Sequence, residues 1–317
     1  MKTSSKFILT GIASLMVVAG VRVMPANAEL KAVSPTSVAG FPTWYEDSNG
    51  LRLDLCLARS ISQTPPGYCL TEPPNPNQSP SVDAEDPAQS NFPDEAFWWT
   101  AEAQVQRNNI SAILVLATEA AFLNEDPVDG DQMVFNRTRI RIQGSALRVN
   151  TRYKITYPYG VQIFTATQKD RRKPPEINIT QDFACAVSVT TTCKFNDLLS
   201  PGTSRVKNPI GPWLRWPDNP TDMPPAGYIG DPNINHTVIG SPIANTRHST
   251  RFQNFFMVEE LNASGQVVGA PIAYTDLFSV SGKLSPVTPP PTETDTTTTV
   301  EPAPATTDPA TAPANGG

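Results

Sequence analysis

Alternation of apolar and polar residues at every second position runs through the middle of the chain and predicts β-strands. In "FNRTRIRI" it separates two faces: Phe135, Arg137, Arg139 and Arg141 against Asn136, Thr138, Ile140 and Ile142. "RYKITYPYG" and "VQIFTATQ" alternate in the same way and are rich in the β-branched and aromatic residues that favour strands. "SAILVLATEAAF" is interpreted as a buried strand, although its Ala and Leu content also suits a helix, and "EAFWWTAEAQV" leaves both possibilities open.

The stretch "GFPTWYEDSNGLRLDLCL" joins an aromatic segment, an acidic cluster and an alternating apolar segment. Asn49-Gly50 stands between the two segments, and both residue types tolerate the positive φ angles of a tight turn. We therefore predict a hairpin whose second strand has Leu51, Leu53, Leu55 and Leu57 on one face. The alternative is a metal loop at residues 46–49, which would need further carboxylates that the stretch lacks.

Composition divides the rest of the chain. The 33 prolines and 18 glycines interrupt nearly every segment, which leaves little room for long helices. We predict an all-β protein with a linker at 29–39, one β-sandwich domain at 40–173 and a second at 174–285, separated at Lys173-Pro174-Pro175. Residues 286–317 are rich in Pro, Thr and Ala and contain no apolar residue larger than Val, so they are expected to form a disordered tail.

One short stretch, "LRVNTRYKITYPYG", places Leu147 six residues before Tyr153 in an L-x-x-x-T-x-Y arrangement. It resembles the tyrosine corner before strand F of fibronectin type III and immunoglobulin-like sandwiches, although the Pro-Gly often found before the Thr is missing. The resemblance implies sandwich domains of that kind, with the Tyr153 hydroxyl bonded to nearby backbone, and it says nothing about function. The alternative is an ordinary strand tyrosine.

Several longer stretches lie between Gly40 and Leu284: "FPTWYEDSNGLRLDLCL", "FPDEAFWWTAEA", "DGDQMVFNRTRIRI", "IGPWLRW", "GYIGDPN" and "TDLFSVSGKL". Through them the chain is similar to a family of exported bacterial proteins of unknown function. The similarity implies no activity and supports only the domain interpretation.

The beginning of the chain has the pattern of an export signal. Lys2 and Lys6 precede an apolar stretch at 7–23 and a small-residue site at Pro25-Ala26-Asn27-Ala28. This arrangement predicts a signal peptide at 1–28, cleaved after Ala28, rather than a retained membrane anchor. The protein is then secreted, to the extracellular space, the periplasm or the cell surface, with no transmembrane anchor after cleavage.

Export makes the chain more acidic. The formal charge is −6, and the leader carries three of the 24 basic residues and none of the 30 acidic ones. The mature chain therefore has 21 basic residues against 30 acidic ones, a formal charge of −9. This acidity argues against nucleic acid as a partner, because phosphate backbones are bound through Lys and Arg.

Four cysteines allow three disulfide pairings, and the sequence alone does not choose among them. They nevertheless fall into two local pairs, Cys56 with Cys69 and Cys185 with Cys193. In an oxidising compartment we expect local structural disulfides, and an unstrained loop of about 15 residues contributes about 3 kcal/mol. A zinc site is the rival interpretation, but the cysteine spacing does not fit it.

Candidate metal and catalytic residues are few. Asp126, Asp129 and Asp131 in "NEDPVDGDQ" could place oxygen ligands around calcium, or could simply form a solvated turn. His236 and His248 are the only histidines, and no nucleophile elbow, zincin motif or phosphate-binding loop accompanies them. Paired carboxylates, for example Asp94 or Glu95 with Glu102, could carry out glycoside hydrolysis. The alternative is that they line the solvent side of a strand.

Large aromatic residues offer another role. Trp98, Trp99, Trp213 and Trp216 could form a stacking platform for an extracellular glycan or a protein surface, or could fill the core. We therefore expect a secreted or cell-surface protein that binds a ligand or builds structure without catalysis, with calcium as its one possible cofactor. The alternative is a secreted carbohydrate-active or metal-assisted hydrolase.

Overall fold

The computed structural model describes residues 30–58, 67–185, 192–199, 210–245 and 252–286. The expected signal peptide, nearly all of the expected tail, and His248 lie outside these residues. Within them the chain forms almost only β-strands, and the only helices are two short 3-10 turns, η1 (Pro87–Gln89) and η2 (Phe195–Leu198). None of the helices in the described part of the chain has the length and apolar character to cross a membrane. The predicted all-β class is confirmed.

Four strands are long: β6 (Glu95–Arg107), β7 (Ile110–Phe122), β8 (Gln132–Gln143) and β11 (Glu176–Ala184). The others are β1 (Leu30–Val33), β2 (Ser37–Val38), β3 (Phe41–Pro42), β4 (Trp44–Asp47), β5 (Arg52–Asp54), β9 (Arg152–Tyr157), β10 (Gly160–Thr165), β12 (His236–Thr237), β13 (Phe256–Leu261), β14 (Ala273–Thr275), β15 (Leu277–Ser281) and β16 (Lys283–Leu284). The two ambiguous apolar stretches are therefore both strands, β6 and β7.

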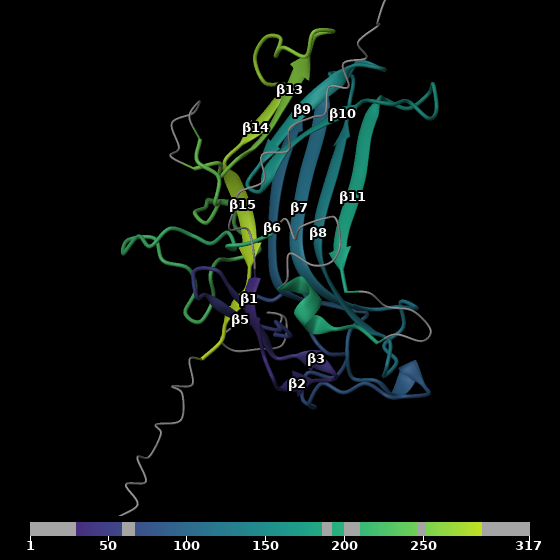
Figure 1. The fold of residues 1–317 in the computed structure, drawn as a ribbon, viewed down its shortest axis with the longest axis vertical. Coiled ribbons are helices and arrows are strands. Elements are labelled where there is room, and N and C mark those ends of the chain that lie inside the picture. Colours follow the sequence, from purple (N-terminus) through teal and green to yellow (C-terminus); the bar gives the residue numbers. More distant parts are fainter. Residues whose placement is uncertain (1–29, 59–66, 186–191, 200–209, 246–251, 287–317) are drawn as a thin grey trace, which may run out of the picture. The chain divides into compact units, whose positions relative to one another are not determined.

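The largest sheet has six antiparallel strands in the order β11-β8-β7-β6-β15-β12. Figure 1 shows its long strands side by side. Side chains alternate between the two faces of a strand, and along β8 this alternation follows the predicted pattern. Asn136, Thr138, Ile140 and Ile142 are buried, whereas the arginines between them are half-exposed.

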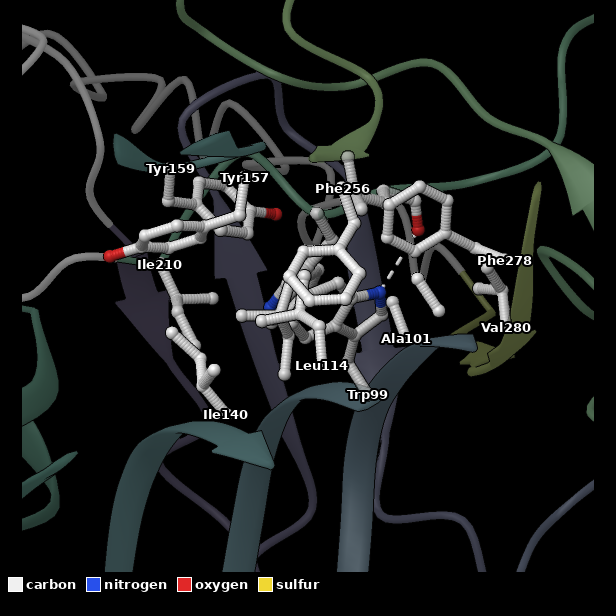
Figure 2. Packing of buried hydrophobic residues seen from close by; sticks show 14 of the residues in the cluster. Trp99, Ala101, Leu114, Ile140, Tyr157, Tyr159, Ile210, Phe256, Phe278 and Val280 are labelled. Atoms are coloured by element: carbon white, nitrogen blue, oxygen red, sulfur yellow. Dashed lines mark hydrogen bonds between the residues drawn. The ribbon is translucent and has the colours of Figure 1, made fainter. Parts of the chain in front are cut away.

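A second antiparallel sheet, in the order β10-β9-β13-β14, packs against the buried face of the first. Figure 2 shows Trp99, Leu114 and Ile140 of the large sheet pointing toward Tyr157 and Phe256 of the second. All five side chains are almost fully buried. Removing a large apolar side chain from water contributes about 1.5–3 kcal/mol, so this interface is the main source of stability.

The third sheet has the order β1-β4-β5-β16 and contains the predicted hairpin between β4 and β5. Gly50 has a φ of 82°, whereas Asn49 is not among the residues with positive φ. The amide of Gly50 donates to the carbonyl of Asp47, and the amide of Asp47 donates to the carbonyl of Leu51. The hairpin is thus a type I turn closed by a glycine bulge, and only the glycine needs the left-handed conformation.

Strands from both sides of the expected domain boundary pair with each other. β11 pairs with β8, β13 pairs with β9, and β15 pairs with β6. The described residues up to Ser285 cluster as one compact unit. Two tandem immunoglobulin-like sandwiches are therefore not confirmed, because strands expected in the second domain complete sheets that begin in the first. The segment expected as a linker, 29–39, contains β1, which pairs with β4.

The tyrosine corner is present as a local structure. The hydroxyl of Tyr153, a fully buried residue at the start of β9, accepts a hydrogen bond of 2.8 Å from the amide of Arg148. Leu147, the apolar residue of the motif, is also buried. The predicted bond from tyrosine to nearby backbone is confirmed, and it fixes the entry of the chain into the second sheet without requiring an immunoglobulin-like topology.

Candidate functional site

The face of the six-stranded sheet that points away from the second sheet is lined with polar and charged side chains. We call it the outer face. The register places Arg139 beside Val115, which lies beside Glu102, and places Arg141 beside Ile113, which lies beside Gln104. On the other side of β8, strand β11 contributes Asn178, Thr180 and Asp182, all exposed.

One end of this face is a closed ionic cluster around Arg137. Its Nε and Nη2 donate to the two carboxylate oxygens of Asp182 at 2.9 and 3.0 Å, a bidentate geometry. Its Nη1 donates to both carboxyl oxygens of Glu119, at 3.2 and 3.1 Å. The guanidinium also lies 4.6 Å from the ring centroid of Phe135. All these contacts leave Arg137 little capacity to bind anything else.

Glu119 is the most perturbed titratable group in this cluster. It is only 3% exposed, and burial raises its pKa to about 8, with the Glu95 and Asp182 carboxylates adding to the rise and Arg137 opposing it. Glu95 is also hydrogen-bonded to it. Glu119 is therefore protonated at neutral pH, and the charge of Arg137 is balanced by Asp182.

The other end of the face is open. Among the described residues, neither Arg139 nor Arg141 forms an ion pair. Nη1 of Arg141 donates to the carbonyl of Ile179 at 2.8 Å and Nη2 donates to the Thr180 hydroxyl at 3.1 Å. The Nε of Arg139 is buried and has no hydrogen-bond partner. Neither guanidinium therefore has a carboxylate in contact with it, although the charge of Glu176 acts on Arg141 from a distance.

The surroundings of these two arginines are mixed in character. Gln104, Asn178 and Thr180 are exposed amide and hydroxyl side chains, while Ile113 and Val115 are half-exposed apolar ones. Burial raises the pKa of Glu102, the one acid of β6 opposite this half. Such a surface can offer charge, neutral hydrogen bonds and apolar contact to one extended ligand.

A second polar group lies at β12, on the far edge of the same sheet. The His236 ring is stacked on Trp216 with centroids 4.3 Å apart, and its Nε2 lies 2.6 Å from an Asp222 carboxylate oxygen. Burial lowers its pKa, but the hydrogen bonds to Asp222 and to the Thr237 carbonyl outweigh burial and raise the pKa overall. Both ring nitrogens of His236 are thus occupied by structural partners, which does not suit a catalytic base.

The four cysteines form the two local disulfides, Cys56–Cys69 and Cys185–Cys193, and no described cysteine is free. The first ties the end of the β4–β5 hairpin to the loop that follows it. The second lies directly after β11 and before η2, next to the closed end of the outer face. Both have structural positions.

The three aspartates considered for calcium do not converge. The Asp129 carboxylate accepts a hydrogen bond from the Gln132 amide at 2.7 Å, and that of Asp131 accepts one from the Asn124 amide at 2.6 Å. Among the described residues no group of three or more His, Cys, Asp or Glu side chains is placed to hold a metal ion. The segment forms a turn stabilised by amide side chains.

The four tryptophans considered as a stacking platform lie in the interior: Trp98, Trp99, Trp213 and Trp216 are 0, 0, 1 and 5% exposed. Three of them donate from Nε1 to buried acceptors, namely Pro42 O, Leu214 O and Thr118 Oγ1. The rings of Trp98, Trp99 and Trp213 are packed in the core, and that of Trp216 is covered by His236, so the expected platform at the surface is corrected to a structural role.

The carboxylates considered for hydrolysis are not brought together. Glu95 and Glu102 lie on one strand seven residues apart, and a strand rises about 3.3 Å per residue. Their separation of about 20 Å exceeds the 5–9.5 Å that a glycosidase pair needs. Glu95 instead meets Glu119 of the neighbouring strand. The sequence analysis missed this pair because Glu119 lies in an apolar stretch. The only signal that could have found it is that Glu119 is the one acidic residue of that stretch.

Comparison with known proteins gives no match: no family model, no curated protein and no solved structure matches the chain. The case for a function therefore depends on the geometry of the chain's own residues.

Proposed function

We propose that this protein is exported and acts as a binding or structural protein, without catalysis, and that its ligand lies on the outer face of the six-stranded sheet. The observation that carries the proposal is the buried, unpartnered Nε of Arg139 beside an unpaired Arg141. A buried donor without an acceptor costs about 1–3 kcal/mol. Native proteins rarely retain such a donor unless water or a ligand supplies the acceptor.

Several features favour binding over hydrolysis. The one carboxyl group with a strongly raised pKa, Glu119, is buried and held by Arg137, so a substrate would have to displace this ionic cluster. The other acid on this face, Glu102, has no second carboxylate at glycosidase distance along its own strand. A sheet surface with mixed side chains instead suits an extended ligand.

Export is supported by the chemistry of the cysteines. All four are in disulfides, and disulfides persist mainly in oxidising compartments outside the cytosol. Together with the leader pattern at 1–28, they favour a site of action in the periplasm, at the cell surface or outside the cell.

The test is a screen of the purified full chain against an array of neutral and acidic glycans, with reducing-end release measured in parallel. We expect saturable binding without turnover, weakened in the double variant Arg139→Gln/Arg141→Gln. Arg148→Gln is the matched control, because Arg148 is an exposed arginine paired with Glu260 of the second sheet. Hydrolysis that is lost in Glu102→Gln or Glu119→Gln, or no binding to any glycan, would overturn the proposal.

A further inference from the structure

The open end of the outer face, around Arg139 and Arg141, also indicates which chemical class of ligand this surface binds. We infer that it binds an extended acidic polysaccharide whose charges are sugar carboxylates, a polyuronate, with Arg139 and Arg141 pairing with the carboxylates. This inference rests on the proposed function and names the ligand of the same surface.

The first argument is charge complementarity. Arg139 and Arg141 lie two positions apart on one strand face, so their Cα atoms are about 7 Å apart. Burial lowers the pKa of Arg141, the charges of Arg139 and Arg137 lower it further, and the Glu176 carboxylate opposes them. Carboxylates relieve the repulsion between these arginines, and a guanidinium binds a carboxylate in bidentate geometry, as Arg137 already does with Asp182.

The second argument is the density of charge. Double-stranded DNA carries one negative charge per about 1.7 Å and is bound by many Lys and Arg side chains. Here two unpaired arginines are available, and Glu102 and Glu176 lie on the same face. The whole chain is acidic, with a formal charge of −6. A polymer with one carboxylate per sugar therefore matches this surface better than a polyphosphate does.

The third argument is the neighbouring side chains. Gln104, Asn178 and Thr180 offer donors and acceptors for hydroxyl groups. Ile113 and Val115, between the arginines and β6, offer apolar contact for the C–H faces of a sugar ring. A ligand with hydroxyls, carboxylates and apolar ring faces uses all three kinds of group.

Glu102 provides a test of the sign of the ligand's charge. It lies on the same row as Arg139, one strand beyond Val115, at about 10 Å from β8 given the spacing of neighbouring strands. Its negative charge opposes an anionic ligand, whereas a neutral glycan would be little affected. Glu102→Gln should therefore tighten polyuronate binding roughly twofold at low salt.

The experiment measures binding of the full chain to polygalacturonate, dextran and double-stranded DNA by calorimetry at about 50 mM salt, where charge effects are weakly screened. Arg139→Gln and Arg141→Gln should each weaken polygalacturonate binding about tenfold, and Arg148→Gln should leave it unchanged. Unchanged unfolding midpoints of the variants establish that they fold.

The outcomes separate the two proposals. Saturable binding to dextran that exceeds binding to polygalacturonate would overturn this inference and leave the proposed binding function standing. DNA binding as tight as polygalacturonate binding would show general anion exchange and also overturn it. Polygalacturonate binding that none of the arginine variants weakens would place the ligand elsewhere and overturn both.

Discussion

The arginines of β8 lie on one strand and point to the same face of the sheet, but their contacts differ. Arg137 is bound on two sides by carboxyl groups and lies over Phe135. Arg139, two positions further on, faces Val115 and Thr180 instead, and its Nε has no partner. The difference comes from the neighbouring strands, which supply acids at one end of the row and none in direct register at the other.

This contrast indicates that one end of the sheet serves stability and the other end serves binding. At the closed end every charge has a partner, as expected of a cluster that holds strands β7, β8 and β11 together. At the open end an unmatched donor is retained at a cost in free energy. Four other buried side-chain atoms of the described residues also lack a partner, so the open end is marked by this donor together with two arginines that form no ion pair, not by the donor alone. Single substitutions separate the contributions of the two ends.

The largest expected effect is a pH dependence that originates in Glu119. Its pKa in the folded protein, about 8, lies above the ordinary value of 4.5. The folded state therefore binds more protons than the unfolded state between these values, and stability falls as pH rises through this window. Glu119→Gln mimics the protonated acid and should remove this loss, which amounts to about 5 kcal/mol.

Urea unfolding of the parent and of Glu119→Gln at pH 5, 7 and 9 measures this effect. The difference between their unfolding free energies at each pH removes the contribution of the titrating groups that both proteins share. The variant should be clearly more stable than the parent at pH 9 and similar to it at pH 5. Glu102→Gln is the comparison: Glu102 lies on the same face outside the Arg137 cluster, and burial also raises its pKa, so a smaller change of the same sign is expected. Equal stability of Glu119→Gln and the parent at pH 9 would show that Glu119 ionises freely and that the closed end is not closed.

The next effect in size is that of removing the central cation. Arg137→Gln leaves Asp182 without its bidentate partner and Glu119 without its main donor. We expect a loss of about 2 kcal/mol of unfolding free energy at pH 7, less than for a fully buried pair because Asp182 is one-third exposed.

Denaturant unfolding checks this value, with Arg148→Gln as the matched control. Arg148 also pairs with a glutamate, but it is mostly exposed, so its loss should cost no more than about 0.5 kcal/mol. If both substitutions cost the same, burial of the Arg137 cluster contributes nothing.

Local features of the fold could be predicted from the sequence, since their causes lie within a few residues. The alternation in β8 assigned Ile140 and Arg139 to opposite faces correctly, because side-chain direction in a strand depends only on position. The Asn49-Gly50 turn and the Tyr153 corner were predicted for the same reason, although the turn places only Gly50 at positive φ.

Long-range pairing could not be predicted in the same way. The pairing of β11 with β8 and of β13 with β9 joins segments that a Pro-rich stretch at 173–175 separates, and nothing in an alternating strand specifies its partner. The candidate site depends on this pairing. Asp182 meets Arg137 only because β11 lies beside β8, 45 residues away in the chain.

The smallest expected effect on stability is at the open end. Arg139→Gln removes a charge that has no ion-pair partner among the described residues and that disfavours the neighbouring Arg141. It also removes the buried, unpartnered Nε. The unfolding free energy should change by at most about 0.5 kcal/mol, and any change should be toward greater stability, because relief of repulsion and of an unsatisfied donor both favour the folded state. Differential scanning calorimetry of Arg139→Gln beside Arg137→Gln measures this contrast directly.

A loss of 2 kcal/mol or more of unfolding free energy in Arg139→Gln would mean that Arg139 supports the sheet as Arg137 does. The division of β8 into a stabilising end and a binding end would then be wrong.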